Sequence, residues 1–419
     1  MDFEINKILL TDSKVDLETT EEKNIGLLIP DIWFLAEGIK YDQISAKDSS
    51  RIFYSDNIMA KITNFSYTLP DNLSSIRVDE LILNSKDSTV KANNFALVPL
   101  VARYDYGPAK GFQSTWLQIE NDSISLKKVD FLGIINNRKL SAHSLNVDKL
   151  DISVFRDKRI EFPEWQRRPL PQASLRDLNF KFEIDTIQLN DGFISYQEHS
   201  EKAYTTGEVF FSDLNATILN LTNDSIRTLS YPNARIGVTA NIFGTGSIKG
   251  EFLFDLVNME NIHSYGIDVE PFDLTEFNRI LIPSASVQIS SGESKKIIMT
   301  AKANEFFSYG EMKFYYNDLK IQLLNRETET PKGIGNVLGS FFANTFIIKS
   351  NNPSNLFLRK GDIFFERDKK RAIFNYWTKT FLSGVVSSIG AANNKKKINK
   401  MQKDNLKKIQ DETKEISKL

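Results

Sequence analysis

The pattern of apolar and polar residues predicts β-strands along most of the chain. It is clearest from Phe180 to Gln197, where apolar residues alternate with polar ones up to Ile184 and again from Ile187. A period of two is typical of strands with one apolar and one polar face. The alternation shifts by one position at Asp185-Thr186, and a β-bulge there would keep the apolar side chains on one face. Asp191-Gly192 then predicts a tight turn, because glycine accepts a positive φ. The stretch is therefore predicted to be a bulged hairpin.

The same pattern recurs elsewhere in the chain. Residues Phe3 to Leu17 align without a gap on Phe182 to Tyr196, and Phe, Glu, Ile, Ile, Leu and Asp are identical. The shared pattern is apolar-x-apolar-Asp/Asn-x-apolar-x-apolar. It also fits Ile76 to Leu83 and Leu145 to Ile152, with looser forms at Ile124 to Phe131 and Ile267 to Leu274. One β module used repeatedly is the prediction that follows.

The predicted fold is mostly β, an elongated and curled antiparallel sheet of repeated bulged hairpins that forms a groove, with short helices near the C-terminus. Charged residues and prolines between Phe155 and Leu175 predict a boundary. We expect an N-terminal β module over residues 1–165, a second β module over 166–375 and a helical tail over 376–419. The expected helices lie at Leu274 to Ile282, Gly333 to Asn344, Trp377 to Ala392 and Lys395 to Leu419.

Composition narrows the possible functions. The net charge of the 419 residues is −1, which does not favour binding of the whole molecule to nucleic acid. The chain has no cysteine, so disulfides, thiol catalysis and thiolate metal sites are excluded. No signal peptide or bilayer-spanning segment is predicted, because the longest uncharged runs fall short of the roughly 20 residues that a spanning helix needs.

The sequence gives little evidence for a catalytic or metal site. Gly244 to Gly250 is rich in glycine, but a strand pattern follows it, so a β-turn is favoured over a phosphate-binding loop. Gly333-Ile334-Gly335 lacks the preceding strand of a dinucleotide site. His143, His199 and His263 show no metal-ligand spacing and are expected at the surface or in turns. No catalytic residue, cofactor or metal site is predicted, and a non-catalytic protein is the expectation.

The C-terminal tail carries a positive charge. Residues 394–419 contain nine lysines and four acidic residues, a net of +5. Three interpretations remain open: a solvated end, a helix that binds a partner protein, and an interfacial helix on anionic lipid headgroups. In the last case Lys395, Lys396, Lys397 and Lys400 are the membrane-surface candidates.

A sheet with one apolar face must cover that face. A second sheet would do so in a β-sandwich, whereas a curled sheet could leave a groove for a ligand. A strand of about seven residues spans roughly 23 Å, a length that suits an extended acyl chain. Once the bulge at Asp185-Thr186 is taken into account, the candidate groove residues all point to the same face of the strand. They are Phe180, Phe182, Ile184, Ile187, Leu189, Ile194 and Tyr196.

Several soft patterns resemble the AsmA-like family of Gram-negative envelope proteins, in particular its long β-rich members, which are related to bridge-like lipid-transfer proteins. The similar stretches cover most of the chain beyond about Phe95. They are Val154 to Arg159, Leu170-Pro171, Phe182 to Leu189, Ile194 to Glu198, Leu219 to Asn223, Leu274 to Asn278, Val287 to Gly292, Gly310 to Lys320, Phe374 to Trp377 and Ser383-Gly384.

The resemblance implies a periplasmic, inner-membrane-associated protein with an apolar β groove. The AsmA-like family is associated with phospholipid movement between the inner and outer membranes and with outer-membrane integrity. Members typically begin with a transmembrane helix, which this sequence does not match, so the anchored form would be longer than this chain. The expected partners are phospholipid or another acyl lipid, a membrane surface and possible envelope proteins. The alternatives are a structural or adhesive β-sandwich without lipid and, third, an enzyme with clustered carboxylates or histidines.

Overall fold

The fold was analysed in a computed structural model, which describes residues 2–17, 26–42, 45, 51–325, 348–355 and 357–403. The protein is mostly β, with mostly antiparallel strands and short helices, as the sequence predicts. It divides into two compact units. Unit 1 comprises Met1–Pro163 and Ser174–Thr245, and unit 2 comprises Glu164–Ala173 and Gly246–Leu419. These bounds differ from the modules expected at 1–165 and 166–375.

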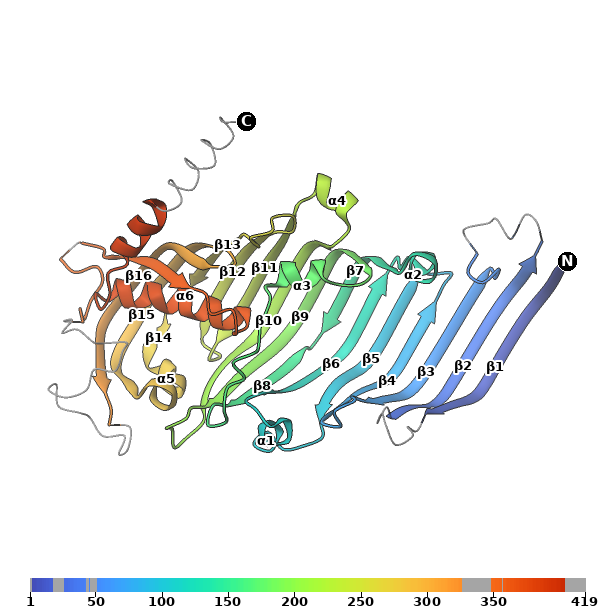
Figure 1. The fold of residues 1–419 in the computed structure, drawn as a ribbon, viewed down its shortest axis with the longest axis horizontal. Helices are drawn as coiled ribbons and strands as arrows, with labels where there is room; N and C mark the ends of the chain where they lie inside the picture. The colour runs from blue at the N-terminus through green and yellow to red at the C-terminus, as the bar shows by residue number, and fades with distance from the viewer. Residues whose placement is uncertain are drawn as a thin grey trace. The chain divides into compact units, whose positions relative to one another are not determined.

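Unit 1 contains eleven of the strands in the described residues (Figure 1). They are β1 (Phe3–Leu17), β2 (Gly26–Tyr41), β3 (Asn57–Thr68), β4 (Ser74–Asn84), β5 (Thr89–Pro99), β6 (Thr115–Lys127), β7 (Lys139–Asp148), β8 (Asp151–Asp157), β9 (Lys181–His199), β10 (Gly207–Thr222) and β11 (Asn233–Ile242). Strands β1 to β6 pair in order as an antiparallel meander, and β9, β10 and β11 continue it. The short helices of unit 1 are α1 (Tyr106–Lys110), α2 (Phe131–Asn137) and α4 (Ser225–Ser230), and α3 (Pro171–Arg176) has residues in both units.

The middle of this sheet departs from a purely antiparallel arrangement. Strands β7 and β8 both pair antiparallel with β6 and parallel with β9, so they act as two halves of one interrupted strand. Lys149, at a φ of 50°, marks the interruption. A parallel neighbour requires a crossover connection, which the residues between β8 and β9 provide.

Left-handed residues occur in the middle of several strands. Asn64, Asn94 and Asn220 have φ values of 53°, 52° and 58°. Asparagine tolerates this conformation better than most residues because its short polar side chain bonds locally. Each of the three interrupts the pleat, so that apolar residues three positions apart, such as Ile62 and Phe65, point to the same face.

Each of these left-handed residues lies opposite an aspartate on a neighbouring strand. Asn64 and Asn94 both lie opposite Asp79, and Asn220 lies opposite Asp185, as the flanking register pairs show. The Asn94 amide donates to the Asp79 carboxylate at 2.9 Å. The Asp of the repeated sequence pattern therefore marks the partner position of a kink, and the parity changes at Asp185 as predicted. The β-bulge predicted there is wrong, because the register of β9 with β7 and β10 does not shift at Asp185, and the left-handed Asn220 of β10 makes the kink instead.

The predicted turn at Asp191-Gly192 is wrong. Strand β9 runs unbroken from Lys181 to His199, and Asp191 adopts a φ of 54° in a bulge opposite β10. An Asp-Gly pair supplies the positive φ of a tight turn, but the same φ also fits a bulge inside a strand. A Cβ at position 192 would lie 2.8 Å from Leu189 Cδ2, so a larger residue there would require the Leu189 side chain to shift.

The N-terminal copy of the module has the same backbone feature. Asp12, which aligns with Asp191 in the sequence, also has a φ of 54°. Asn6, which aligns with Asp185, lies opposite the left-handed Gly38 of β2. The gapless alignment of the two stretches thus corresponds to two strands that are kinked at equivalent positions.

Unit 2 has a closed core. Its elements are β12 (Gly246–Asp255), β13 (His263–Val269), β14 (Phe272–Asp273), η2 (Leu274–Phe277), α5 (Asn278–Ala285), β15 (Val287–Ala303), β16 (Phe307–Leu323), β17 (Lys360–Glu366) and α6 (Ile373–Ser388). Alternate residues of β15 and β16 pack with α6, and Ile297, Met299 and Met312 are at most 1% exposed. Leu170, from the segment between β8 and β9, belongs to this core.

Helix α6 also closes the outer edge of β17. Ser387 Oγ accepts from the Asp362 N–H at 3.0 Å, and Ser383 Oγ accepts from the Phe364 N–H at 3.2 Å. The Phe364 and Asp362 carbonyls accept from Ser383 and Asn394, at 2.9 and 2.7 Å. Covering an edge strand in this way prevents further strand pairing.

The helix predictions have mixed outcomes. The one at Leu274 to Ile282 is confirmed by η2 and α5, and the one at Trp377 to Ala392 corresponds to α6, which begins four residues earlier and ends at Ser388. Residues 395–403 are helical, whereas the rest of the tail and the helix predicted at Gly333 to Asn344 lie outside the described residues. Gly244 is in a turn and β12 follows, as predicted.

The kink at Asn64 can be tested with two substitutions. We expect Asn64→Gly to leave the stability of the protein nearly unchanged, because glycine adopts a φ of 53° freely. Asn64→Val should lower the free energy of unfolding by about 1–2 kcal/mol, because a β-branched residue is strained in this conformation. Urea unfolding followed by circular dichroism measures both. Equal stability of the two variants would contradict the assigned role of Asn64.

Candidate apolar groove

The site is built from rows of residues that lie side by side across the strands of unit 1. Paired residues in adjacent strands point to the same face of a sheet. Following the register pairs from β2 to β11 gives one row in which every residue is apolar. We call it the Ile62 row, and it consists of Ile32, Ile62, Leu81, Ala92, Ile124, Val147, Leu189, Ala216 and Val238.

A second row runs beside the first and begins on β1. We call it the Leu83 row, and it consists of Leu10, Phe34, Ala60, Leu83, Val90, Leu126, Leu145, Ile187, Ile218 and Ile236. The two rows define what we call the apolar face of unit 1. Between β2 and β11 each row crosses eight strand spacings of ~4.8 Å, or about 38 Å.

These rows remain partly open to solvent. All nine residues of the Ile62 row are half-buried, as are all members of the Leu83 row except Leu10, which is 49% exposed. A sheet face covered by a second layer looks different, as β15 shows in unit 2, where alternate residues are buried beneath α6. The apolar face of unit 1 is therefore shaped as a groove and not as the inside of a closed sandwich.

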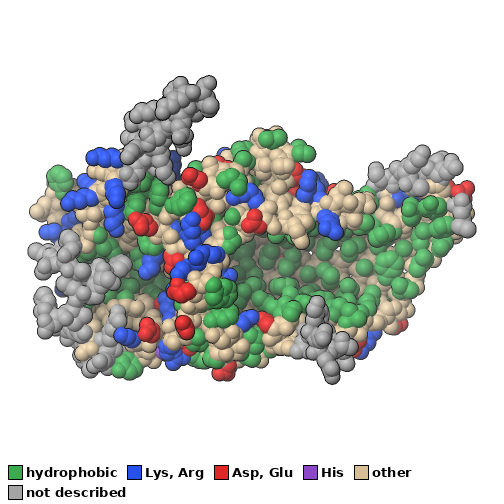
Figure 2. Space-filling view, in the orientation of Figure 1, with side chains coloured by type: hydrophobic (Ala, Val, Ile, Leu, Met, Phe, Trp, Pro, Cys, Tyr) green, Lys and Arg blue, Asp and Glu red, His purple; other side chains and the backbone are tan. Residues whose placement is uncertain are grey.

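Figure 2 shows the groove directly. Hydrophobic side chains line a hollow over strands β2 to β5, whereas lysine, arginine, aspartate and glutamate side chains lie around its margins. The strands that line it are the ones kinked at Asn64 and Asn94, and a left-handed residue within a strand bends that strand. The kinks thus hold the apolar side chains on one face and curve that face.

The opposite face of the same strands is mostly polar. The row next to the Ile62 row on that face consists of Lys61, Ile82, Lys91, Ser125, Asn146, Gln188, Thr217 and Gly237. Ile82, which lies between Lys61 and Lys91, is one apolar exception, and Trp33 of β2, which lies opposite Lys61, is another. The two faces of unit 1 therefore differ sharply in chemistry.

The structure places the seven predicted groove residues as follows. Phe182, Ile184, Ile187, Leu189, Ile194 and Tyr196 lie on the apolar face of β9, since all their register partners on β7, β8 and β10 are apolar. Ile184 is 2% exposed and so offers little surface to a ligand. Phe180 precedes β9 and lies outside the strand.

Most of the groove was not named from the sequence. The larger part belongs to β3, β4, β5 and β6, with residues such as Ile62, Leu81 and Ile124. The signal was present, because the repeated pattern at Ile76 to Leu83 covers β4. Pairing this pattern with its neighbours requires the register, which alternation within one strand does not provide.

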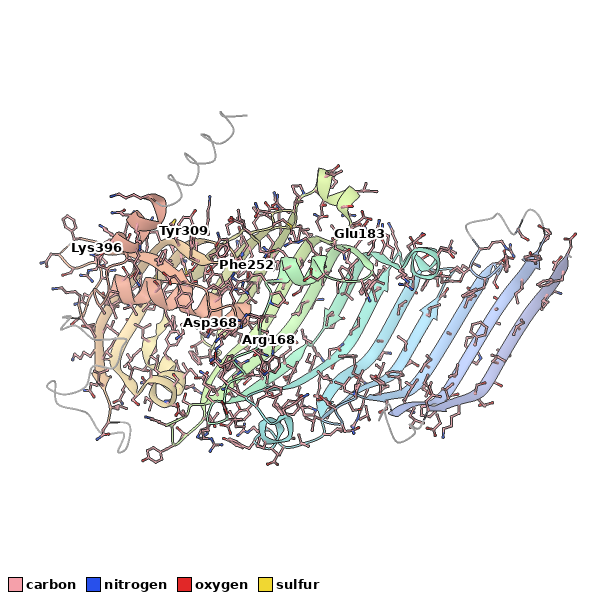
Figure 3. The ribbon with its side chains drawn as sticks, in the orientation of Figure 1. Arg168, Glu183, Phe252, Tyr309, Asp368 and Lys396 are labelled. Atoms are coloured by element: carbon pink, nitrogen blue, oxygen red, sulfur yellow. The ribbon has the colours of Figure 1, made fainter. Side chains whose placement is uncertain are left out.

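A charged cluster lies at the start of β9. Glu183 (labelled in Figure 3) contacts Lys139 at 2.9 Å and Arg227 at 2.8 Å. Arg227 also contacts Asp185 at 2.6 Å, and His143 contacts the same carboxylate at 2.8 Å. The opposite charges are paired within the cluster, so the arrangement serves to hold strands β7 and β9 and helix α4 together.

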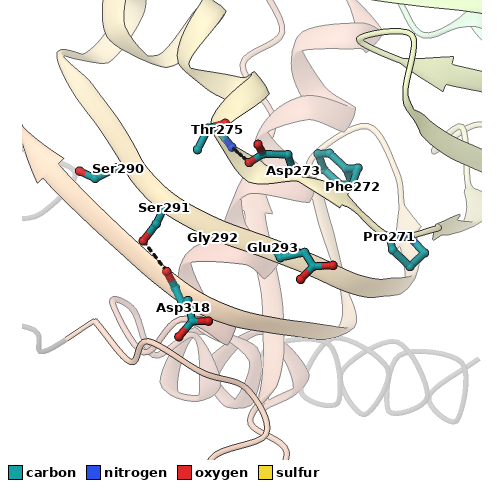
Figure 4. Close-up of a pocket in the computed structure, with 9 residues that line it drawn as sticks. All are labelled: Pro271, Phe272, Asp273, Thr275, Ser290, Ser291, Gly292, Glu293 and Asp318. Carbon is teal, nitrogen blue, oxygen red and sulfur yellow. Dashed lines mark hydrogen bonds between the residues drawn. The ribbon is translucent and has the colours of Figure 1, made fainter.

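Unit 2 has a polar pocket of about 620 Å³ (Figure 4). Its lining includes Asp273, Glu293 and Asp318 but no histidine, lysine or arginine. Asp273 caps η2 by accepting from the Thr275 N–H at 2.8 Å, and the Ser291 hydroxyl donates to the Asp318 carbonyl at 2.7 Å. No group of three or more histidine, cysteine or acidic residues that could hold a metal occurs among the described residues. The lining combines these carboxylates with the hydroxyls of Thr275, Ser290 and Ser291, and Glu293 contacts Lys295, which lies outside the lining, at 2.6 Å.

Two of the three histidines are not at the surface, contrary to prediction. His143 is exposed on β7, but His199 and His263 are buried. The Nε2 atom of His263 accepts from Trp377 Nε1 of α6 at 3.3 Å, and its Nδ1 atom lies 3.1 Å from the Asn261 carbonyl. Burial lowers the pKa of His263 from 6.5 to about 4. A neutral His263 therefore helps to fix α6 on the sheet, in an aromatic cluster that includes Phe252 (Figure 3).

The predicted membrane-surface lysines are exposed. Lys395, Lys396, Lys397 and Lys400 lie on the helix at 395–403, where Ile398 and Met401 are half-buried. None of the helices in the described part of the chain is long and apolar enough to span a membrane. No protein-family model matches the sequence, and a search of curated proteins found no match. The fold and its groove define a class of protein, an open β-sheet with one accessible apolar face.

The role of His263 predicts a pH dependence of stability. Below pH 6.5 the unfolded chain takes up a proton at this residue, whereas the folded protein does so only near pH 4. The free energy of unfolding should therefore fall by about 3 kcal/mol between pH 7 and pH 4 through this group. His263→Gln should remove that part of the pH dependence, measured by urea unfolding of the wild type and the variant across this pH range. An unchanged slope in His263→Gln would refute this role.

Proposed function

We propose that unit 1 is a non-catalytic lipid-binding device whose apolar face holds the acyl chains of phospholipids. The observation that supports it is the pair of apolar rows, which are continuous across the strands and half-buried from β2 to β11. A groove lined only by aliphatic and aromatic side chains suits a ligand without polar groups along its length. Each buried methylene of such a ligand contributes about 0.8 kcal/mol.

The margins of the groove fit the other part of a phospholipid. Lysine and arginine side chains lie there among acidic ones (Figure 2), and they would face the headgroup phosphates while the chains lie inside. The proposal extends to a place in the cell. The resemblance to AsmA-like proteins supports an envelope protein of the periplasm that moves phospholipid between membranes and supports outer-membrane integrity.

The alternative, a structural or adhesive β-sandwich without lipid, would cover the apolar face with protein. The half-buried rows of unit 1 favour the lipid-binding role, since a second sheet would bury them. The third alternative, an enzyme, would use the carboxylates that line the pocket of unit 2, but Glu293 there is already paired with Lys295.

Lipid binding can be tested with a pair of adjacent substitutions on β4. Leu81→Glu places a carboxylate in the Ile62 row, and we expect about tenfold less co-purified phospholipid, because a charge against acyl chains costs more than the ~1.4 kcal/mol that a factor of ten represents. Ile82→Glu is the matched control, since Ile82 lies on the polar face between two lysines. Native mass spectrometry of gently purified protein counts the bound lipids.

Two results would contradict the proposal. One is recovery of the wild-type protein without any bound lipid, even after incubation with phospholipid vesicles. The other is an equal loss of lipid in Leu81→Glu and Ile82→Glu, since only the first substitution changes the groove. Circular dichroism of both variants distinguishes loss of binding from loss of fold.

The basic tail predicts a second, separate interaction. Replacing Lys395, Lys396, Lys397 and Lys400 with glutamine should weaken binding to vesicles that contain anionic lipid, by roughly 1 kcal/mol per lysine at low salt. Vesicle co-sedimentation at two salt concentrations measures the effect, and neutral vesicles are the control. Unchanged binding to anionic vesicles at low salt would remove these lysines from the proposal.

A further inference from the structure

Strand β1 is the exposed edge of the sheet in unit 1. It pairs with β2 along one side, and Figure 1 shows it at the end of the sheet. Nearly all of its fifteen residues are exposed, including Phe3 at 44% and Leu17 at 54%. Long apolar edge strands are templates for pairing with another chain, and proteins usually protect them. Unit 2 protects its β17 edge with α6, whereas no such cover lies on β1 in the described residues.

The positions of β1 that point to the apolar face are distributed symmetrically along the strand on either side of Leu9. The register with β2 places Phe3, Ile5, Ile8, Leu10, Ser13 and Val15 on the apolar face. If two copies of β1 pair antiparallel with Leu9 opposite Leu9, residue n of one strand lies opposite residue 18−n of the other. Each residue of this set then lies opposite another member of the same set. An antiparallel strand of the same sequence, centred on Leu9, would therefore keep apolar side chains opposite apolar-face side chains along its length.

The kinks of β1 obey the same symmetry. Four left-handed residues of unit 1 lie opposite an asparagine or aspartate, namely Asn64, Asn94, Asn220 and Gly38, whereas Asp12 and Asp213 lie at register shifts. Asp12 of β1 is left-handed, and 18−12 is 6. In the symmetric pairing Asp12 would therefore lie opposite Asn6 of the second strand, as those four residues lie opposite Asn or Asp in the sheet. A register shifted by two residues in either direction breaks this match.

We propose that two copies of this chain associate through antiparallel pairing of their β1 strands, centred on Leu9. Glu4 of each copy then lies opposite Lys14 of the other, which gives two charge pairs on the polar face. Ile8 lies opposite Leu10 of the second copy, so the Leu83 row continues from one copy into the next. Asp2 of one copy would lie opposite Asp16 of the other, and the pairing ends before these two residues, which carry like charges. The inference does not rest on lipid binding, because it depends only on β1.

Cysteine cross-linking tests the register, because the chain has no cysteine of its own. Opposite residues in an antiparallel pair have Cα atoms ~4.5–5.5 Å apart, which a disulfide can bridge. Leu9→Cys alone should therefore form a disulfide dimer under mild oxidation. Lys7→Cys alone should not, because its equivalent in the second copy lies four residues along the strand, about 13 Å away. A mixture of Lys7→Cys and Thr11→Cys should cross-link.

Sedimentation equilibrium tests the association itself. The wild type should show a dimer whose dissociation constant rises about tenfold in Glu4→Lys, and Glu4→Lys/Lys14→Glu should restore it. A monomer at every concentration, together with no cross-link in Leu9→Cys, would overturn the proposal. The same result is expected if another segment or protein occupies this edge. Equal cross-linking of Leu9→Cys and Lys7→Cys would overturn the register.

Discussion

The face of the sheet to which each side chain points is the constraint on which the rest of unit 1 depends. In a long strand strict alternation places every second side chain on the same face, and a single slip moves all later side chains to the other face. Left-handed asparagines such as Asn64 and Asn220 reset the alternation where the apolar spacing changes from two to three. Without these residues the apolar rows would divide between the two faces, and neither face would be uniformly apolar.

The two units solve the burial problem in different ways. Unit 2 covers alternate residues of β15 and β16 with α6, and small residues permit a close approach. A Cβ on Gly361, for example, would lie 2.3 Å from the Gly384 carbonyl oxygen. Unit 1 leaves its rows half-buried over many strands. One chain thus combines a conventionally packed core with a sheet whose apolar face remains accessible.

The sequence predicted the strand class, the repeat and the slip at Asp185, because all three depend on local patterns. It failed at Asp191-Gly192, where the same local conformation serves a turn or a bulge, and the neighbouring strand β10 determines which one forms. It also failed at His263, since burial of this histidine depends on Trp377, which lies more than a hundred residues further along the chain. The groove was predicted only on β9, because row continuity depends on register between strands.

The contacts between α6 and β17 have a consequence for aggregation. Both hydrogen-bonding groups of Asp362 and of Phe364 are occupied by side chains from α6 and Asn394. Another strand can add to this edge only after the helix has left it. Local melting of α6 is therefore the first step toward self-association at this edge, and the stability of one helix sets the kinetic barrier against fibril-like growth.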